Sequence, residues 1–194
     1  MSASDSLSAL AHEVRLILAE ASGLDPTQIV IGPPHEAAKQ QENGNQSLDY
    51  LCVFFYRIAY SGFPADAASI DPLYLKALCM VTALGGRSGE RTPGDSELRL
   101  IGAVAECFHR YPLLKLDAAQ IQIVPTQLSL DDINHLWATQ NNTPYRLSLS
   151  YEFSLLPVPM KARVESSPRV ENVFLTVKPL ETDNSAADTR EDGS

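Results

Sequence analysis

The chain has 194 residues, 44% of them hydrophobic and 20% charged, with a formal net charge of -9. This balance is typical of a soluble globular protein, and no apolar run reaches the roughly 18 residues that span a bilayer. The acidic charge without clustered Lys and Arg argues against a nucleic-acid binder, because phosphate contacts need such clusters. The N-terminus lacks the basic segment of a secretory signal, so we expect a cytoplasmic protein with no direct membrane insertion.

The first two segments of the chain differ in their hydrophobic pattern. Apolar residues recur at spacings of three and four over residues 5–22, and this period predicts an amphipathic helix ending at Gly23. Residues 33–45 contain two prolines and are rich in Gln and Asn. That composition predicts an exposed surface loop.

Two long segments then read as strands. Residues 48–58 and 73–84 are aromatic or β-branched on both alternating sets, which predicts two facing strands covered on both sides. The glycine-rich stretch from Gly85 to Gly94 follows them, and an enzyme that binds phosphate there is one alternative. The stretch lacks the Gly-Lys-Ser/Thr sequence of a phosphate-binding loop, which favours a simple connector.

Two further helices and a short strand are predicted in the middle of the chain. Asp95 is expected to cap a helix that ends at Tyr111-Pro112 and buries Leu98, Ile101, Ala105 and Phe108. Residues 121–124 form a short strand candidate beside Pro125. Ser129 is expected to cap the next helix, with an apolar face made of Leu130, Ile133, Leu136 and Trp137.

The clearest alternation in the chain runs from Tyr145 to Leu156 and predicts a half-exposed antiparallel strand. Its apolar members are Tyr145, Leu147, Leu149, Tyr151, Phe153 and Leu155. Its polar members, named the polar set below, are Arg146, Ser148, Ser150, Glu152 and Ser154. The polar set could face either water or a partner.

The C-terminal part of the chain suggests three regions. We expect a core domain over residues 1–160, an extended arm over residues 161–180 and an acidic disordered tail over residues 181–194. The arm carries one strand-like segment, named the arm segment below, with Val170, Val173, Phe174, Leu175 and Val177 as its apolar residues. An apolar segment on a linker has to pair with its own sheet or with a neighbouring subunit.

No catalytic, cofactor or metal site is indicated. Cys52, Cys79 and Cys107 lie in apolar segments, which predicts buried reduced thiols rather than disulfides or ligands. The four histidines show no pair at the spacing of four that places metal ligands on one helical face. We therefore expect a protein that is not an enzyme.

Several motifs together resemble the cap proteins of extracellular contractile injection systems, which are phage-tail-like particles. The resemblance covers roughly residues 5–160 and rests on the stretches Asp71–Gly85, Glu97–Gly102 and Phe108–Leu114. Its most specific part is the helix that ends in Leu136-Trp137, followed by Pro144-Tyr145-Arg146 in the next strand.

The resemblance implies an α/β fold of the α+β type, a mixed and largely antiparallel sheet flanked by about three helices, as in a phage tail terminator. It implies a homohexameric ring that ends polymerisation of the inner tube protein, anchors the last layer of sheath protein and remains in the particle. We hypothesise that the polar set lies on a ring or tube interface and that the arm segment adds a strand to a neighbouring cap or sheath subunit. The alternative is an assembly adaptor or chaperone-like module of the same machinery that leaves the finished particle.

Overall fold

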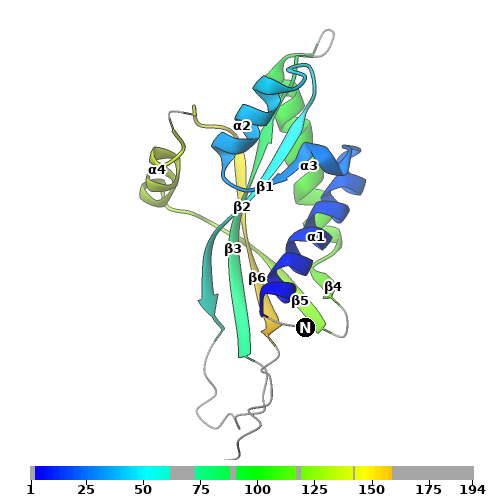
Figure 1. Ribbon diagram of the computed structural model, residues 1–194, viewed down its shortest axis with the longest axis vertical. Helices are drawn as coiled ribbons and strands as arrows, with labels where there is room; N and C mark the ends of the chain where they lie inside the picture. The colour runs from blue at the N-terminus through cyan, green and yellow to red at the C-terminus, as the bar shows by residue number, and fades with distance from the viewer. Residues whose placement is uncertain (1–2, 62–72, 88–90, 117–118, 142, 159–194) are drawn as a thin grey trace, which may run out of the picture. The chain divides into compact units, whose positions relative to one another are not determined.

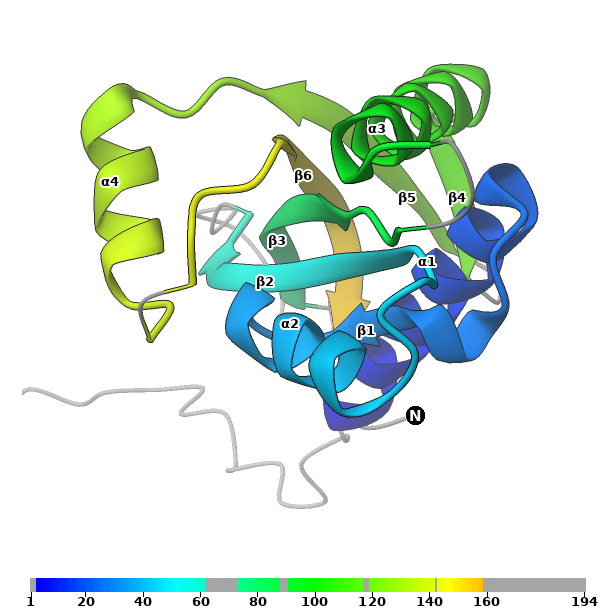
Figure 2. The same ribbon diagram turned by 90° about the horizontal axis from the view of Figure 1, so that it is seen from above.

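The computed structural model describes residues 3–61, 73–87, 91–116, 119–141 and 143–158 (Figure 1). The chain divides into a compact unit, Met1–Ala162, and a second unit, Arg163–Ser194, which lies outside the described residues. The first unit contains a six-stranded sheet with helices on both of its faces (Figure 2).

The first unit contains helices and strands interspersed along the chain. In chain order the elements are α1 (Ala3–Ser22), a short 3-10 helix (Pro26–Gln28), β1 (Ile29–Ile31), α2 (Pro34–Asn43), β2 (Tyr50–Tyr60), β3 (Leu73–Leu84), α3 (Pro93–Arg110), β4 (Leu113–Leu116), β5 (Ala119–Thr126), α4 (Leu130–Ala138) and β6 (Ser148–Val158). The predicted first helix and the two long predicted strands are confirmed as α1, β2 and β3.

The sheet has the strand order β1-β2-β3-β6-β5-β4. Only β1 and β2 run parallel, and the other neighbouring strands are antiparallel. This confirms the predicted mixed, largely antiparallel α+β fold. β2 and β3 pair directly, with Leu51 opposite Ala83. The expectation that both strands are covered on both faces is wrong for the second half of β2, where Arg57, Ile58 and Tyr60 are exposed.

The main core lies between one face of the sheet, the inner face, and helices α1 and α3. Both helices bury a stripe against it, because their apolar residues recur with the helical period. Phe153 of β6 lies at its centre, 6.0 Å from Phe55 and 5.8 Å from Phe108 between ring centroids. The buried apolar residues of the two helices are Leu10, Val14, Leu18, Ala19, Leu100, Val104, Cys107 and Phe108.

Helix α2 replaces the predicted surface loop, and that prediction is wrong. Pro33 and Pro34 stand at the N-cap and first helical positions, where proline is well tolerated because the first amides have no helical partner. The following Ala, Lys, Gln and Glu residues are good helix formers. The helix buries Ala37 against Tyr50, Cys52 and Leu84 on the outer face of the sheet. The described part of the chain therefore has four α-helices, one more than expected.

Helix α3 begins and packs differently from its prediction. Its cap is Thr92, whose hydroxyl accepts from the amide of Asp95, while the Asp95 carboxylate accepts from Thr92 in return. The predicted stripe is correct for Phe108, which is buried, and for Ile101, which is partly buried against the core, and wrong for its other two members. Leu98 is 64% exposed and Ala105 is exposed, because the helix turns Ser96, Leu100, Val104 and Cys107 inward.

The glycine stretch before α3 is a connector whose described part packs tightly against the chain. A Cβ at Gly85 would lie 2.0 Å from the carbonyl oxygen of Pro93, and one at Gly86 would lie 2.5 Å from Ser47. Any larger residue would collide with main chain at both positions. Glycine here therefore serves packing within the fold.

Strands β4 and β5 complete the sheet, and helix α4 follows them in the chain. β4 was not predicted, and β5 is longer than the four residues expected, with Leu114 opposite Ile121. The predicted cap of α4 is confirmed, because the Ser129 hydroxyl accepts from the amide of Asp132. Its predicted apolar face is only partly covered, since Trp137 is buried whereas Leu130 is 78% exposed.

Strand β6 differs from its predicted form at both ends. Tyr145, Arg146 and Leu147 precede the strand. An irregularity near the other end shifts the register between Leu75 and Ala77 of β3, and Leu155 there has a φ of 64°. The shift turns Leu155 out, at 47% exposed, and buries Leu156 in its place. Between these ends Tyr151 and Phe153 face the core as expected.

Candidate interaction surface

The outer face of the sheet, opposite α1 and α3, carries most of the polar set. Helix α2 covers one end of this face through Ala37. Ser148 and Ser150 of β6 lie farther along it, with Thr126 of β5 opposite Ser150. The sheet pleat puts these alternate residues on one side, as the sequence predicted.

The hydroxyl groups of this row bond to one another across the strands. Ser150 Oγ lies 2.8 Å from Thr126 Oγ1 and donates to the carbonyl oxygen of Cys79 at 3.2 Å. Ser148 Oγ lies 3.0 Å from Thr82 Oγ1. Ser150 is only 8% exposed, so these hydroxyls form a satisfied polar floor rather than free binding groups.

The other end of the polar set carries charge. Glu152 lies 3.5 Å from the ammonium group of Lys76 on β3. Ser154 donates a hydrogen bond of 2.6 Å to the other oxygen of the same carboxylate. This part of the polar set is half-buried, and its charges are paired within the chain.

Arg146 stands apart from the remainder of the polar set. It precedes β6, and its Nη1 donates to Glu97 Oε1 of α3 at 2.9 Å. Glu97 also accepts from the amide of Gly85, at 3.3 Å. Arg146 therefore ties the segment before β6 to the start of α3, and the structure does not group it with Ser150, Glu152 and Ser154.

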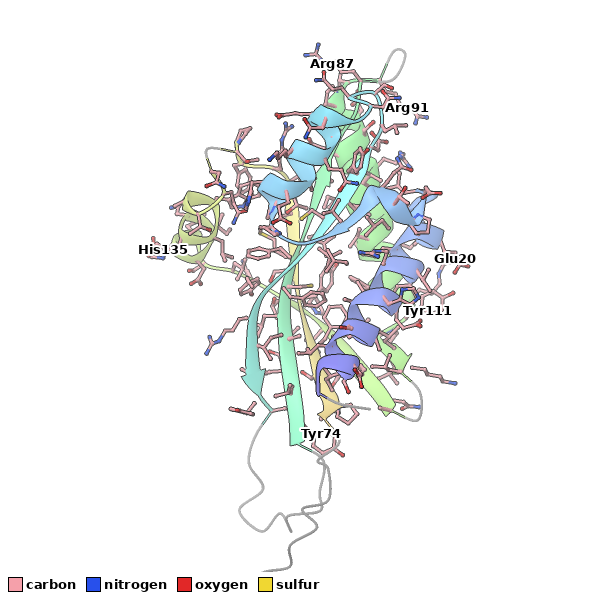
Figure 3. The ribbon with its side chains drawn as sticks, in the orientation of Figure 1. Glu20, Tyr74, Arg87, Arg91, Tyr111 and His135 are labelled. Carbon is pink, nitrogen blue, oxygen red and sulfur yellow. The ribbon has the colours of Figure 1, made fainter. Side chains whose placement is uncertain are left out.

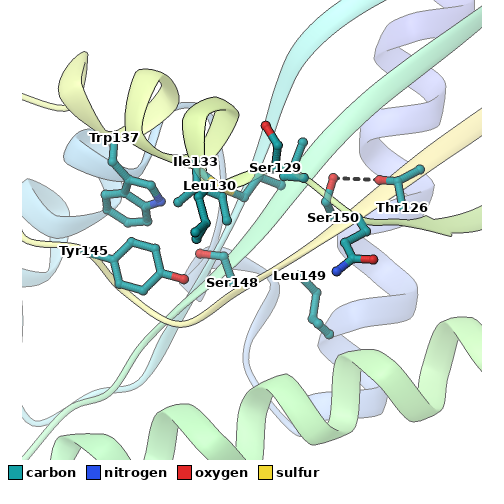
Figure 4. A pocket seen from close by; sticks show the side chains of 12 residues that line it. Thr126, Ser129, Leu130, Ile133, Trp137, Tyr145, Ser148, Leu149 and Ser150 are labelled. Carbon is teal, nitrogen blue, oxygen red and sulfur yellow. Dashed lines mark hydrogen bonds between the residues drawn. The ribbon is translucent and has the colours of Figure 1, made fainter.

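A groove, named the α4 groove below, opens between α4 and the outer face of the sheet (Figure 4). It has a volume of about 490 Å³. One wall is apolar, and the hydroxyl row forms the floor. The lining residues are Met80, Thr126, Gln127, Leu128, Ser129, Leu130, Ile133, Trp137, Tyr145, Ser148, Leu149 and Ser150.

Helix α4 is held to the remainder of the unit at its C-terminal end. The rings of Trp137 and Tyr145 pack edge to face with centroids 5.2 Å apart. The amide oxygen of Gln140, just beyond α4, lies 3.3 Å from His35 Nδ1 of α2. At the N-terminal end Leu130 lines the groove and is 78% exposed. Sequence periodicity predicted the apolar side of α4 but not the groove beside it.

Titratable and nucleophilic groups do not converge on this surface. In the described ranges, no group of three or more His, Cys, Asp or Glu is placed to hold a metal ion. His135 lies on the side of α4 that faces away from the sheet (Figure 3). The predicted buried free cysteines are confirmed. Burial raises the pKa of Cys52 to about 12 and the pKa of Cys79 above its usual range, so both thiols are protonated at neutral pH.

Two further expectations concern membranes and the arm. No helix in the described residues is both long and apolar enough to span a membrane. The arm segment, with Val170, Val173, Phe174, Leu175 and Val177, lies outside the described residues, as does the acidic tail.

Comparison with known proteins agrees with the resemblance seen in the sequence. Residues 7–172 match the model of the Pvc16 N-terminal domain family. The fold is similar to a solved sheath/tube terminator of an extracellular contractile injection system, PVC, in its extended state, with a TM-score of 0.55. It is also similar to the tube-terminating cap of the anti-feeding prophage, with a TM-score of 0.57.

Both solved structures share 19% sequence identity with this chain, and the matches cover 92% of it. They cover 64% of the PVC terminator and 62% of the prophage cap, so the chain spans less than two thirds of either protein. No curated protein sequence matches the chain. These likenesses establish the fold.

Proposed function

The chain belongs to the Pvc16 N-terminal domain family, and from this membership we propose that it is a structural cap, or tail terminator, of a contractile injection system. The observation that carries the proposal is the family match over residues 7–172. The two solved proteins of similar fold, which bear the names terminator and cap, support it.

The proposed mechanism is a property of shape and symmetry. Six copies form a closed ring, and the ring presents a tube-like surface to the last layer of the inner tube on one side only. A head-to-tail stack of rings continues as long as each new ring offers the same surface again. A ring without that surface on its far side ends the stack, and no catalytic residue is needed.

The partners that follow from this mechanism are the inner tube protein, the sheath protein and further copies of the chain. Assembly takes place in the cytoplasm, and the cap stays in the finished particle. The polar set on the outer face of the sheet, chiefly Glu152 with Ser154, is proposed to meet a neighbouring subunit or the tube. The arm segment is proposed to reach a neighbouring cap subunit or the terminal sheath subunit.

The adaptor or chaperone-like alternative is less well supported, because the two proteins of similar fold are named as a terminator and a cap of the particle. The two functions differ in a simple observable. A cap remains in purified particles, whereas an adaptor is absent from them.

Light scattering after size exclusion tests the proposed ring. The chain is measured alone and after mixing with its tube protein. A species near six times the chain mass of 21.2 kDa, alone or on addition of tube, is expected. A chain that stays monomeric at all concentrations and does not bind the tube protein contradicts the proposal.

A further inference from the structure

The far half of β2 is an open edge of the sheet. β1 pairs only with residues 51–53, and the amide of Gly32 just after β1 donates to the carbonyl oxygen of Val53 at 3.1 Å. Gly32 and the two prolines after it then lead the chain out of the sheet into α2. Within the described part of the chain, no strand pairs with residues 54–60 on this side, where the sheet ends in Figure 1. These seven residues, named the open edge below, are about 23 Å long at about 3.3 Å per residue.

The main chain of the open edge is directed outward at Ile58. Ser61, directly after β2, donates its amide to the carbonyl oxygen of Tyr74 at 2.9 Å. In an antiparallel pair every second residue bonds to the partner strand, so Ala59 turns its main-chain groups towards β3 and Ile58 turns them away. The N–H and C=O of Ile58 are therefore a donor and an acceptor with which an added strand can pair.

The side chains of the open edge define what kind of strand fits it. Ile58 lies opposite Ala77 and so on the inner face, where it is 43% exposed at the rim of the core. Arg57 lies opposite Leu78 and so on the outer face, in a row that continues to Glu152. An apolar residue beside Ile58 would extend the core and remove that side chain from water.

Arg57 is the charge that an incoming strand meets on the outer face. It is exposed, and among the described residues no carboxylate forms an ion pair with it, because Glu152 in the same row is paired with Lys76 at 3.5 Å. An Asp or Glu directly opposite Arg57 on an added strand makes a stabilising cross-strand pair of opposite charges. Since alternate residues of a strand face opposite sides, the fitting segment carries this carboxylate between two apolar residues.

A second copy of the chain does not supply such a segment from its described edges. β1 and β4, at the two ends of the sheet, contain no acidic residue, and their one charged residue is Lys115. Pairing the open edges of two copies brings Arg57 towards its own counterpart. Like charges at opposite positions are destabilising, and a cation on an edge strand hinders pairing between copies. The charge therefore favours a strand from a different protein.

We propose that the open edge of β2 accepts an extended segment of a partner protein as an added strand, with a carboxylate of that segment opposite Arg57 and apolar residues beside Ile58. The added strand takes the place next to β2 that β1 leaves after Gly32. The inference goes beyond the proposed function, because it assigns a surface and a partner chemistry that termination of a tube does not require.

A hairpin peptide tests the open edge on the full-length chain. The probe is a backbone-cyclised, fluorescein-labelled hairpin whose outer strand contains Val-Glu-Val, and a second hairpin contains Val-Lys-Val instead. Fluorescence anisotropy should show a dissociation constant at or below about 1 mM for the first hairpin and about fivefold weaker binding of the second. Arg57→Glu should reverse this preference. The matched control, Lys115→Glu on the exposed side of β4, should leave it unchanged.

Hydrogen exchange of the wild-type chain locates the bound hairpin without any substitution. With the Val-Glu-Val hairpin at about ten times its dissociation constant, the amide of Ile58 should exchange about tenfold more slowly, as measured by NMR. The amides of α3 should be unaffected and serve as the internal control. This measurement distinguishes strand addition at the open edge from binding elsewhere on the surface.

Four results would overturn the inference. They are failure of both hairpins to bind, equal affinity of the two hairpins for the wild type, protection at β4 or α4 in place of the open edge, and protection of Ile58 without any peptide. In the last case, protection that grows with protein concentration assigns the open edge to a second copy. Protection that is already complete in dilute protein shows that the chain covers this edge itself. The cap function is decided separately, by the length of tubes.

Discussion

Arg99 of α3 and Asp49, the residue before β2, form an ion pair with 2.9 Å between Nη2 and Oδ2. The other carboxylate oxygen of Asp49 accepts from the amide of Gly86 at 2.8 Å, and Arg99 Nη1 donates to the carbonyl oxygen of Ser22 at 3.3 Å. Two side chains thus join the end of α1, the start of β2 and the connector after β3. This network holds α3 in place over the inner face.

We predict that Asp49→Ala lowers the free energy of unfolding by about 2 kcal/mol, because it leaves the Gly86 amide without its acceptor and Arg99 Nη2 without its ion-pair partner. Urea denaturation measures the change. The control is Glu106→Ala, which removes a pair with Arg110 on the exposed side of α3 and should cost no more than about 0.5 kcal/mol. Equal losses in the two variants would contradict the role of the network.

Gly86→Ala should destabilise the fold, because its Cβ would lie 2.5 Å from the carbonyl carbon and oxygen of Ser47. Relieving such an overlap needs main-chain movement and costs about 1–3 kcal/mol. Gly102→Ala in α3 is the matched control, since a Cβ there meets nothing within 4 Å. That control should stabilise the helix by about 0.5–1 kcal/mol. A free energy of unfolding of Gly86→Ala equal to or above that of the wild type would contradict this prediction.

The cysteines predict a loss of stability at alkaline pH. Burial raises the folded pKa of Cys52 to about 12, with the charge of Glu36 adding to the effect, and raises that of Cys79 further. The unfolded thiols lose their protons near pH 9, so the folded state is favoured fully below that pH and progressively less above it. Chemical denaturation between pH 7 and 10 should show this fall, and Cys52→Ala with Cys79→Ala should flatten it. A profile that is flat in wild type contradicts the prediction.

Charge exchange on β3 and β6 tests whether the polar set lies at an interface. Glu152→Lys alone opposes Lys76, whereas Glu152→Lys combined with Lys76→Glu restores the pair with reversed sign. Both variants should unfold within about 1 kcal/mol of wild type, because the pair is half-buried and solvent screens it. If a partner binds this surface, the combined variant should still lose ring or tube binding in pull-down assays. Full binding by the combined variant would show that no partner contacts these two charges.

Local signals explain what the sequence predicted well. The cap of α4 was correctly predicted because Ser129 and Asp132 satisfy each other within one turn. The two-sided apolar pattern of residues 73–84 likewise identified β3, a strand with neighbours on both sides.

The errors arise where distant contacts override local composition. Residues 34–43 are polar, which favoured a loop, but their helix is also supported by the packing of Ala37 on Tyr50 of β2, a contact distant in the sequence. Leu156 is buried in the core where Leu155 was predicted, because the register of β6 against β3 is irregular at this point. A prediction from strict alternation cannot include such an irregularity. The α4 groove depends on how far α4 stands from β6, and periodicity along one helix carries no information on that distance.

Tube length tests the central claim most directly. Purified inner tube protein is polymerised with and without this chain, and electron micrographs give the lengths and the appearance of the tube ends. We predict that stoichiometric amounts of the chain shorten the tubes and place added density at one end only. Tubes of unchanged length with two bare ends would contradict a terminator.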